Sequence, residues 1–399
     1  MRGFPPPPEL RVAADQVYAD VRHTQWFMQH VREVEPTADV SSRHEPVFEF
    51  PVARRDLDDL PLPDAGDPSI GAAPGTWTFA DMLAGTDTDG IIVLRDGRLL
   101  CERYFGSLRP ETPHLWHSIT KSLASCVAAN LVERGVLGAD TPIVRYVPEL
   151  ADSAYGDVTV RHLLDMTVGV RYVEDHEDLD TEDSRLDRLC GLKPRQSSDE
   201  PGSVYDYATT TVTDGGRGRV LHYVSLNTDV LGWVMERATG QPAPELLHRE
   251  VWSRLGTEHD AYIALDGAGS AQLDGGFCSS LRDLARFGLM LAKGGRLAGR
   301  TVVPEWWIDD ARRNGDRSAF AASDDPDMLP GGSYRNCFWV AEKEGRTVLL
   351  GIGMYGQMLY VDPDLHIVIA KFSSQPRAGL AAPITRTFVA LESLAGALT

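Results

Sequence analysis

The stretch "LWHSITKSLAS", from Leu115 to Ser125, places a serine and a lysine three positions apart where a buried helix is predicted to begin. After Ser118, apolar residues recur every four positions up to Gly135, which is the spacing of a helix with a buried face and a glycine stop. Lys121 then lies about one turn beyond Ser118 on nearly the same face, so its amine can reach the serine hydroxyl.

This spacing suits a nucleophilic serine with a lysine as its proton acceptor. The positive end of the helix and burial both oppose the ammonium form, so we expect the pKa of Lys121 to be lowered. A serine beside a neutral amine becomes a nucleophile. The same residues are also compatible with a plain helix cap at Ser118 and a solvated Lys121. Other motifs are needed to decide between these interpretations.

The net charge of the chain excludes several kinds of partner. The 399 residues include 39 Lys+Arg and 58 Asp+Glu, a formal charge of −19, so a nucleic-acid backbone or an anionic membrane surface would be repelled. No signal-peptide core and no apolar run of membrane-spanning length occurs. We therefore expect a cytoplasmic protein that takes a small-molecule substrate and has no nucleic-acid or membrane partner. The oligomeric state stays open, a homodimer included.

The sequence predicts no cofactor and no metal site. The five cysteines are odd in number, widely spaced and without CxxC pairs, which argues against a disulfide framework and a thiolate zinc site. We expect them to be reduced and mostly buried. The segment "DGGRGR" does not follow a strand and open a helix as a phosphate-binding loop must. The acidic run "EDHEDLDTED" lacks the glycine and the spacing of a calcium loop.

The order of the predicted elements places strands near both ends of the main body and helices in its middle. Residues 1–75 are rich in proline and predict an irregular arm. "GIIVLRDGRLLCERYF", with a turn at Asp96-Gly97, predicts a hairpin. "TVLLGIGMYGQMLYVDP" and "HIVIAKFSS" predict adjacent strands joined at Pro363-Asp364. Helical patterns occupy "VRHLLDM", "NTDVLGWVMERATG", "SLRDLARFGLMLAKGG" and the closing "APITRTFVALESLAGAL".

Several motifs in the right order resemble the serine β-lactamase and penicillin-recognising family. "LWHSITKSL" is similar to its nucleophile motif, and "TVRHLLDMTVGV" to a segment of its class C and esterase branch. "HYVSLNTDVLGWVMERATG" and "GIGMYGQMLYVDP" stand where the second motif, Tyr-x-Asn, and the third motif, Lys-Thr-Gly or His-Thr-Gly, are expected. "YVPEL", "NTDVL", "RDLAR" and "GIG" followed by "GQ" look like the nylon-oligomer hydrolases and related carboxylesterases.

The resemblance covers roughly residues 76–399 and implies an α/β (α+β) fold of the β-lactamase/transpeptidase type. Such a fold has an antiparallel sheet flanked by helices and a mostly helical lobe. The α/β lobe would comprise about residues 76–140 and 255–399, and the helical lobe about residues 141–254.

The resemblance also implies catalytic roles. Ser118 would be the nucleophile, Lys121 the proton acceptor, and Tyr223 the phenol that passes a proton to the leaving group. The oxyanion hole would consist of the backbone N–H groups of Ser118 and Met354. The chemistry agrees with these roles, because an ammonium stabilises a neighbouring phenolate and a Lys/Tyr pair can carry one proton through both half-reactions.

Two departures from the family pattern concern the substrate. Ser225 replaces the asparagine of the second motif, and Gly351-Ile352-Gly353 replaces the third motif without a cationic side chain. Penicillins carry a carboxylate that the missing cation helps to hold, so these departures argue against a β-lactamase activity. An uncharged or aminated acyl substrate fits this acidic chain better.

Further residues bear on substrate binding. The resemblance implies that Asp187 and Asp274 lie near the substrate, where both could meet an ammonium. Asp187 could equally belong to a solvated loop, because residues 174–188 hold eight acidic and two basic residues. His176 replaces a tyrosine of the amide-cleaving members, which puts amide cleavage in doubt, although histidine can still donate a hydrogen bond. Trp339 could line the substrate pocket or belong to the core.

The sequence therefore predicts a serine hydrolase that cleaves carboxylic esters, and linear amides as a further substrate class, through an acyl-enzyme on Ser118. Two alternatives stay open. One is an acyltransferase that uses the same acyl-enzyme, and the other is a catalytically silent binding protein with the same fold.

Overall fold

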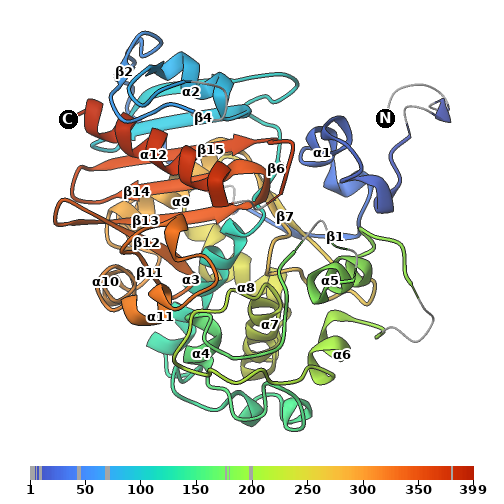
Figure 1. Ribbon diagram of the computed structural model, residues 1–399. Helices are drawn as coiled ribbons and strands as arrows, with labels where there is room; N and C mark the ends of the chain where they lie inside the picture. The colour runs from blue at the N-terminus through green and yellow to red at the C-terminus, as the bar shows by residue number, and fades with distance from the viewer. Residues whose placement is uncertain are drawn as a thin grey trace.

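A seven-stranded antiparallel sheet is the largest element in the described part of the computed structural model (Figure 1). Two of its strands precede the helical middle of the chain and five follow it. In spatial order the strands are β11 (Ser333–Arg335), β12 (Phe338–Lys343), β13 (Arg346–Gly353), β14 (Gln357–Asp362), β15 (Ile367–Ser373), β4 (Thr88–Arg95) and β5 (Arg98–Tyr104). The structure describes residues 5, 7, 8, 11–42, 46–67, 72–175, 178, 180–196, 201–378 and 381–399.

The two faces of this sheet pack against different helices, because successive side chains of a strand point to opposite faces. Val368 packs against helix α9 (Leu281–Ala292), where a Cβ on Gly288 would come within 2.6 Å of Val368 Cγ1. On the other face, the Tyr360 hydroxyl donates a hydrogen bond of 2.7 Å to a carboxylate of helix α12 (Ala381–Ala397). Figure 1 shows α12 in front of the sheet and α9 behind it. The sheet therefore separates two apolar cores.

The predicted hairpin and C-terminal strands are present, with one correction. The hairpin turns at Asp96 and Gly97, whose left-handed φ angles of 53° and 72° suit a two-residue loop. The stretch 347–363, expected as one strand, contains two antiparallel strands separated by the 3-10 turn η9 (Met354–Gly356). Tyr355 makes this turn with a φ of 57°, and its mostly apolar surroundings gave no polar turn signal.

A second sheet, of four strands, leads the chain to the start of helix α3 (Ile119–Glu133). Its order is β1 (Thr37–Val40), β7 (Ala261–Ala264), β8 (Phe277–Ser279) and β6 (His114–Leu115). Trp116, which follows β6, donates its backbone N–H to the carbonyl of Phe277 at 2.8 Å. This pairing fixes the chain immediately before Ser118.

Helix α3 is the helix predicted from the opening stretch, and it is buried along nearly its whole length. Small residues such as Ala124 and Ala128 let other elements approach it from all sides. The buried amide of Asn130 donates to the carbonyls of Glu250 and Val302, both at 2.9 Å. With its polar groups satisfied in this way, α3 can form the centre of the molecule.

The other helices include those predicted around "VRHLLDM" and "NTDVLGWVMERATG". They are α1 (Val21–Phe27), α2 (Phe79–Gly85), α4 (Val160–Leu164), α5 (Glu182–Cys190), α6 (Val204–Thr209), α7 (Leu226–Thr239), α8 (Ala243–Glu250), α10 (Glu305–Arg313) and α11 (Arg317–Ala321). Short strands complete the fold: β2 (Pro61–Leu62), β3 (Trp77–Thr78), β9 (Arg296–Leu297) and β10 (Arg300–Thr301). The described 3-10 turns besides η9 are η2 (Ala14–Gln16), η3 (Val31–Glu33), η5 (Ile143–Arg145), η6 (Pro148–Leu150), η7 (Trp252–Arg254) and η8 (Pro326–Met328).

Two expectations drawn from composition can be compared with the structure. All five cysteines are buried and none forms a disulfide, as predicted. Of the helices that the structure describes, none has both the length and the apolar character that crossing a membrane requires.

Candidate active site

Ser118 occupies the N-cap of α3, three positions after the end of the short strand β6. His117 makes the turn between the two elements with a left-handed φ of 48°. Backbone N–H groups at the start of a helix have no carbonyl partner within the helix. The N–H of Ser118 is therefore placed to donate to a ligand, and the Ser118 side chain lines a cavity of about 740 Å³.

Lys121 lies one turn into α3, is 1% exposed, and donates to three oxygen atoms. Its Nζ is 2.8 Å from Ser118 Oγ, 3.1 Å from Ser225 Oγ and 2.6 Å from the carbonyl oxygen of Asp274. An ammonium has three protons to donate, and these contacts can use all of them. The predicted meeting of Ser118 and Lys121 is therefore present.

The electrostatic surroundings of Lys121 differ from our prediction. Burial does oppose its charge, but the acidic groups of Tyr223, Asp274 and Glu174 outweigh burial and raise the pKa of Lys121 above its ordinary value. Our expectation of a lowered pKa considered only burial and the helix end, and it is wrong. Burial also raises the pKa of Tyr223, and the nearby ammonium of Lys121 offsets only part of this increase. Both shifts favour the protonated form of the group.

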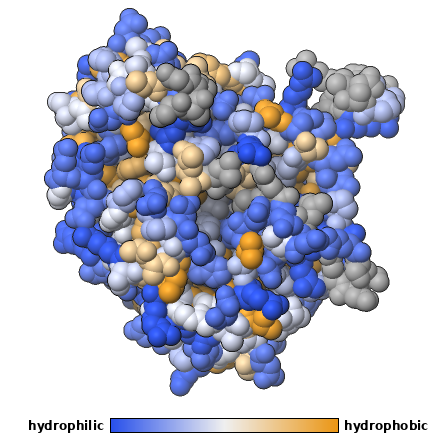
Figure 2. All heavy atoms as spheres, in the orientation of Figure 1, coloured by the Kyte–Doolittle hydropathy of each residue, from blue (hydrophilic) through white to orange (hydrophobic). Residues whose placement is uncertain are grey.

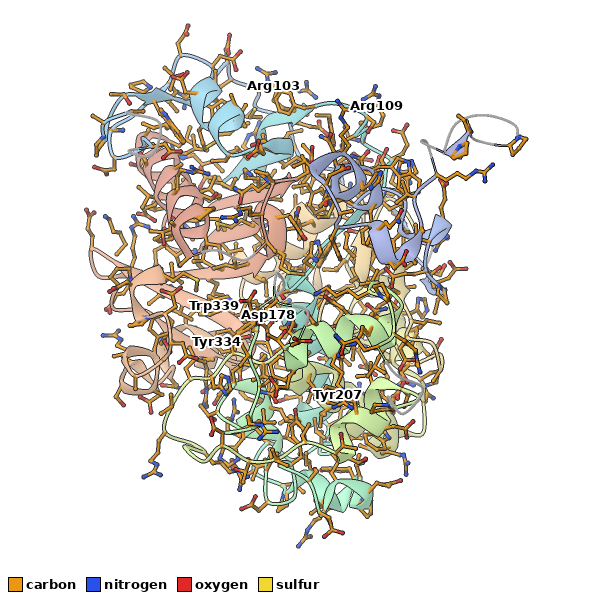
Figure 3. All side chains as sticks on the ribbon, turned by 45° about the vertical axis from the view of Figure 1, so that its right-hand side comes forward. Arg103, Arg109, Asp178, Tyr207, Tyr334 and Trp339 are labelled. Carbon is orange, nitrogen blue, oxygen red and sulfur yellow. The ribbon has the colours of Figure 1, made fainter. Side chains whose placement is uncertain are left out.

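Tyr223 precedes α7 and is held by aromatic side chains from the large sheet. Its ring centre is 5.1 Å from Lys121 Nζ. The ring stacks on Trp339 at 5.2 Å and meets Tyr334 edge-on at 5.9 Å. Figure 3 shows Tyr334 and Trp339 close together on β11 and β12. Trp339 lines the cavity, so the residue that we expected at the substrate also orients the phenol.

Glu174, which the sequence reasoning did not single out, holds Ser225. The Ser225 backbone N–H donates to one carboxylate oxygen of Glu174 at 2.9 Å, and the Ser225 hydroxyl donates to the other at 2.5 Å. Ser225 is the N-cap of α7, where an anion is stabilised by the helix dipole. Ser225 therefore connects the carboxylate of Glu174 to the ammonium of Lys121. The sequence shows the acidic run, but it does not indicate which residue of the run contacts the site.

Asp229, one turn into α7, is a second residue that the sequence reasoning missed. One of its carboxylate oxygens accepts the backbone N–H of Asp274 at 3.1 Å. This contact holds the peptide whose carbonyl accepts from Lys121. Burial and the charge of Asp274 raise the pKa of Asp229 well above its ordinary value. An apolar helix pattern surrounds Asp229 in the sequence, and only its burial marks it as unusual.

Glycines bring the end of β13 against the start of α3. A Cβ on Gly353 would come within 2.6 Å of the Trp116 carbonyl oxygen, and one on Gly351 within 3.0 Å of Ile119 Cγ2. These contacts explain why both positions are glycine. Ser118, Gly353 and Met354 line the same cavity, so the two expected oxyanion donors belong to one site.

The cavity has an acidic and partly apolar lining. Four of its carboxylates come from two loops, Glu174 and Asp175 on one and Asp324 and Asp325 on the other. No lysine or arginine occurs among the described residues that line it. Its apolar members include Leu221, Met328, Ile352 and Ile384. The face shown in Figure 2 is mostly hydrophilic and is hollowed near its centre.

The three remaining substrate-binding predictions are not tested by this geometry. Asp187 forms an ion pair of 3.0 Å with Lys193. The backbone of Asp274 accepts a hydrogen bond from Lys121 and donates one to Asp229. Neither residue is among those that line the cavity. His176 lies outside the described residues. Within the described ranges, no group of three or more His, Cys, Asp or Glu side chains could hold a metal ion.

Known proteins resemble this chain in sequence and in fold. Residues 78–392 match the model of the Beta-lactamase family. The chain is 35% identical to 6-aminohexanoate-dimer hydrolase of Paenarthrobacter ureafaciens over 376 residues, which are 94% of this chain and 90% of that protein. It is 32% identical to Esterase EstB of Burkholderia gladioli over 195 residues, 44% of this chain and 45% of that protein.

A solved structure from Bacillus anthracis, assigned to the 6-aminohexanoate-dimer hydrolases, superposes with a TM-score of 0.85 at 27% identity and covers 98% of both chains. This likeness confirms the expected fold of the β-lactamase/transpeptidase type. Named relatives of this chain are hydrolases and esterases, so it is an enzyme. The chain belongs to the beta-lactamase family.

Proposed function

We propose that this enzyme hydrolyses carboxylic esters, and linear amides more slowly, through an acyl-enzyme on Ser118. The observation that carries the proposal is the 2.8 Å contact between Lys121 Nζ and Ser118 Oγ in a cavity that Tyr223 and Met354 also line. A nucleophile, a proton acceptor beside it, a second proton carrier and backbone donors are the groups that acyl transfer to a serine needs. The names of the esterase and hydrolase relatives agree with this chemistry.

In the proposed reaction, the reactive form of the enzyme is the one in which the Lys121–Tyr223 pair has lost one proton to the solvent. The pair takes the proton of Ser118 Oγ while this oxygen attacks the carbonyl carbon, and the oxyanion accepts from the N–H groups of Ser118 and Met354. The C–O or C–N bond then breaks, and the leaving group receives the proton. Water repeats the sequence on the acyl-enzyme and releases the acid. Each group of the pair titrates in the field of the other, so the proton belongs to the pair.

The charge of the cavity supports an uncharged or aminated substrate. Its lining holds Glu174, Asp175, Asp324 and Asp325 and, among the described residues, no lysine or arginine that could pair with a substrate carboxylate. The field of these carboxylates disfavours penicillins and cephalosporins, which carry an anion. A substrate ammonium would be attracted by the same field.

A substrate panel tests the proposed activity. The panel consists of p-nitrophenyl esters of increasing chain length, nitrocefin and linear amino-acid amides, each measured with the wild type and with Ser118→Ala. We expect the short esters to be cleaved fastest and a fluorophosphonate to label the wild type stoichiometrically at Ser118. Nitrocefin turnover comparable to ester turnover, or labelling that persists in Ser118→Ala, would contradict the proposal. Formation of new esters when an alcohol is added would identify an acyltransferase instead.

Matched substrates test the preference for an amine. An ester with a free ammonium on its acyl chain should have a kcat/KM about twofold to tenfold higher than its N-acetylated form, because an exposed charge pair contributes about 1 kcal/mol. The preference should shrink with added salt. Equal values for the two substrates would mean that the carboxylates of the cavity do not act on the substrate.

A further inference from the structure

The residues next to the two proposed oxyanion donors share an uncommon backbone conformation. His117 precedes Ser118 with a φ of 48°, and Tyr355 follows Met354 with a φ of 57°. Non-glycine residues seldom adopt this left-handed region, and they keep it only where their surroundings hold them in place. The positions of both donor N–H groups therefore depend on whatever holds His117 and Tyr355. This dependence rests on the proposed function, which assigns the two N–H groups their role.

An aromatic residue near the N-terminus lies against both of these residues. The ring of Tyr18 stacks on Tyr355, with centroids 5.4 Å apart and planes 11° apart. It is also 6.4 Å from the ring of His117, and His117 is 5.5 Å from Tyr355. The three rings form one cluster, which we call the Tyr18 cluster. Through this cluster, Tyr18, which precedes helix α1, contacts the neighbours of both proposed oxyanion donors.

The segment that carries Tyr18 is itself fixed to the start of α3. Phe27 meets Tyr18 edge-on at 5.6 Å and is 1% exposed. The carbonyl of Met28 accepts the backbone N–H of Leu115 at 2.8 Å. The Met28 sulfur is 3.2 Å from His117 Nε2. Tyr18 is thus anchored to the body of the enzyme, and it can resist movement of the two residues that it contacts.

We propose that Tyr18 is a positioning residue that keeps the N–H groups of Ser118 and Met354 aligned on one oxyanion. Tyr18 lies outside residues 78–392, the part of the chain that matches the family. Removing one oxyanion donor typically lowers kcat by about 10²- to 10³-fold, so a looser pair of donors should lower kcat by a smaller factor. The ground-state substrate relies less on these donors, so KM should change little.

The test compares three variants of the full-length enzyme. Tyr18→Ala removes the stacked ring, and Tyr18→Phe keeps the ring without its hydroxyl. Trp26→Ala is the matched control, because Trp26 belongs to the same segment but stacks, at 4.5 Å, on His30, which is not a member of the Tyr18 cluster. For each variant, kcat and KM are measured with a p-nitrophenyl ester, together with the inhibition constant of a boronic acid. A boronic acid bonds to the serine oxygen and forms a tetrahedral anion that requires both donors.

We expect Tyr18→Ala to lose about tenfold to a hundredfold in kcat, with KM changed less than about threefold. The boronic acid should bind more weakly by a similar factor. Tyr18→Phe should restore kcat to within about twofold, and Trp26→Ala should match the wild type. Circular dichroism and thermal unfolding check that all variants are folded at the assay temperature.

Three results would overturn the inference. They are a Tyr18→Ala enzyme with wild-type kcat and boronic acid affinity, an equal loss of kcat in Trp26→Ala, and a Tyr18→Phe enzyme as impaired as Tyr18→Ala. Ser118→Ala in the same assay separates these results from a failure of the proposed function. If ester cleavage does not depend on Ser118, both proposals fail. If it does depend on Ser118, the results for the Tyr18 variants test only the positioning role of Tyr18.

Discussion

Two buried lysines of this enzyme make similar local contacts and lie in different places. Lys121 of α3 is 1% exposed and donates to Ser118 Oγ and to the carbonyl of Asp274. Lys371 of β15 is 0% exposed and donates to Ser373 Oγ and to the carbonyl of Thr86. Each lysine is thus a buried amine beside a serine hydroxyl. Judged by this contact alone, either pair could supply a nucleophile.

The difference between the two pairs lies in their neighbours and in access. At Lys121, acidic groups outweigh burial and raise the pKa. At Lys371, burial outweighs the charges of Asp89 and Asp87 and lowers the pKa to about 7. Ser118 lines the large cavity, whereas Ser373 is fully buried in the sheet. A lysine with a lowered pKa is therefore not by itself the mark of the active site in this molecule. The cavity and the phenol of Tyr223 beside Lys121 distinguish the proposed site.

The largest expected difference is between removing the hydroxyl of Ser118 and removing the hydroxyl of Ser373. Ser118→Ala should lower kcat/KM for a p-nitrophenyl ester by about 10⁴-fold or more, because it removes the hydroxyl on which the proposed acyl-enzyme forms. Ser373→Ala should keep kcat/KM within about threefold of the wild type. Steady-state kinetics on both variants measures the contrast. A residual activity above about a tenth in Ser118→Ala would show that the wrong nucleophile has been assigned.

Removing the two amines should give the next largest contrast. Lys121→Met should lower kcat by about 10³-fold or more, since the hydroxyl loses its proton acceptor. Lys371→Met should change kcat by less than about threefold. The same ester assay applies, with circular dichroism to check folding. Comparable losses in the two variants would mean that Lys121 acts on the fold and not on the reaction.

Lys371, which we expect to matter little for activity, should make the free energy of unfolding depend on pH. The pKa of Lys371 is about 7 when folded, below the ordinary value of about 10.4 for an unfolded chain. Between these values the unfolded state binds more protons, so the free energy of unfolding should rise with pH. From pH 7 to pH 9 the wild type should gain roughly 2 kcal/mol relative to Lys371→Met in urea denaturation. Parallel curves for the two proteins would contradict the lowered pKa.

The smallest effect concerns Glu174, a carboxylate that contributes to the pKa shifts of the site. Glu174 contributes to raising the pKa values of both Lys121 and Tyr223. Glu174→Gln should lower both values, so the rise of kcat/KM with pH should begin at lower pH. The ratio of kcat/KM at pH 6.5 to that at pH 9 should increase about twofold to fivefold. Glu245→Gln, at an exposed position of α8, should leave the ratio unchanged, and an unchanged ratio in Glu174→Gln would remove this carboxylate from the mechanism.

Features that depend on neighbours in the chain could be predicted from the sequence. The helix after Ser118, the reach of Lys121 to its hydroxyl and the turn at Asp96-Gly97 each follow from backbone geometry over a few residues. Their outcome depends little on the rest of the molecule. The order of the motifs likewise identified the family before any contact was known.

Features that depend on distant residues required the tertiary structure. The sign of the pKa shift of Lys121 is decided by Glu174, Tyr223 and Asp274, which are remote in sequence and approach only when the loops pack around α3. The break at Met354–Gly356 was hidden by its mostly apolar neighbours. Tyr18 had no sequence signal at all, since its stacking on Tyr355 joins residues from opposite ends of the chain. Electrostatic and packing energies depend on distances in space, and the fold alone sets those distances.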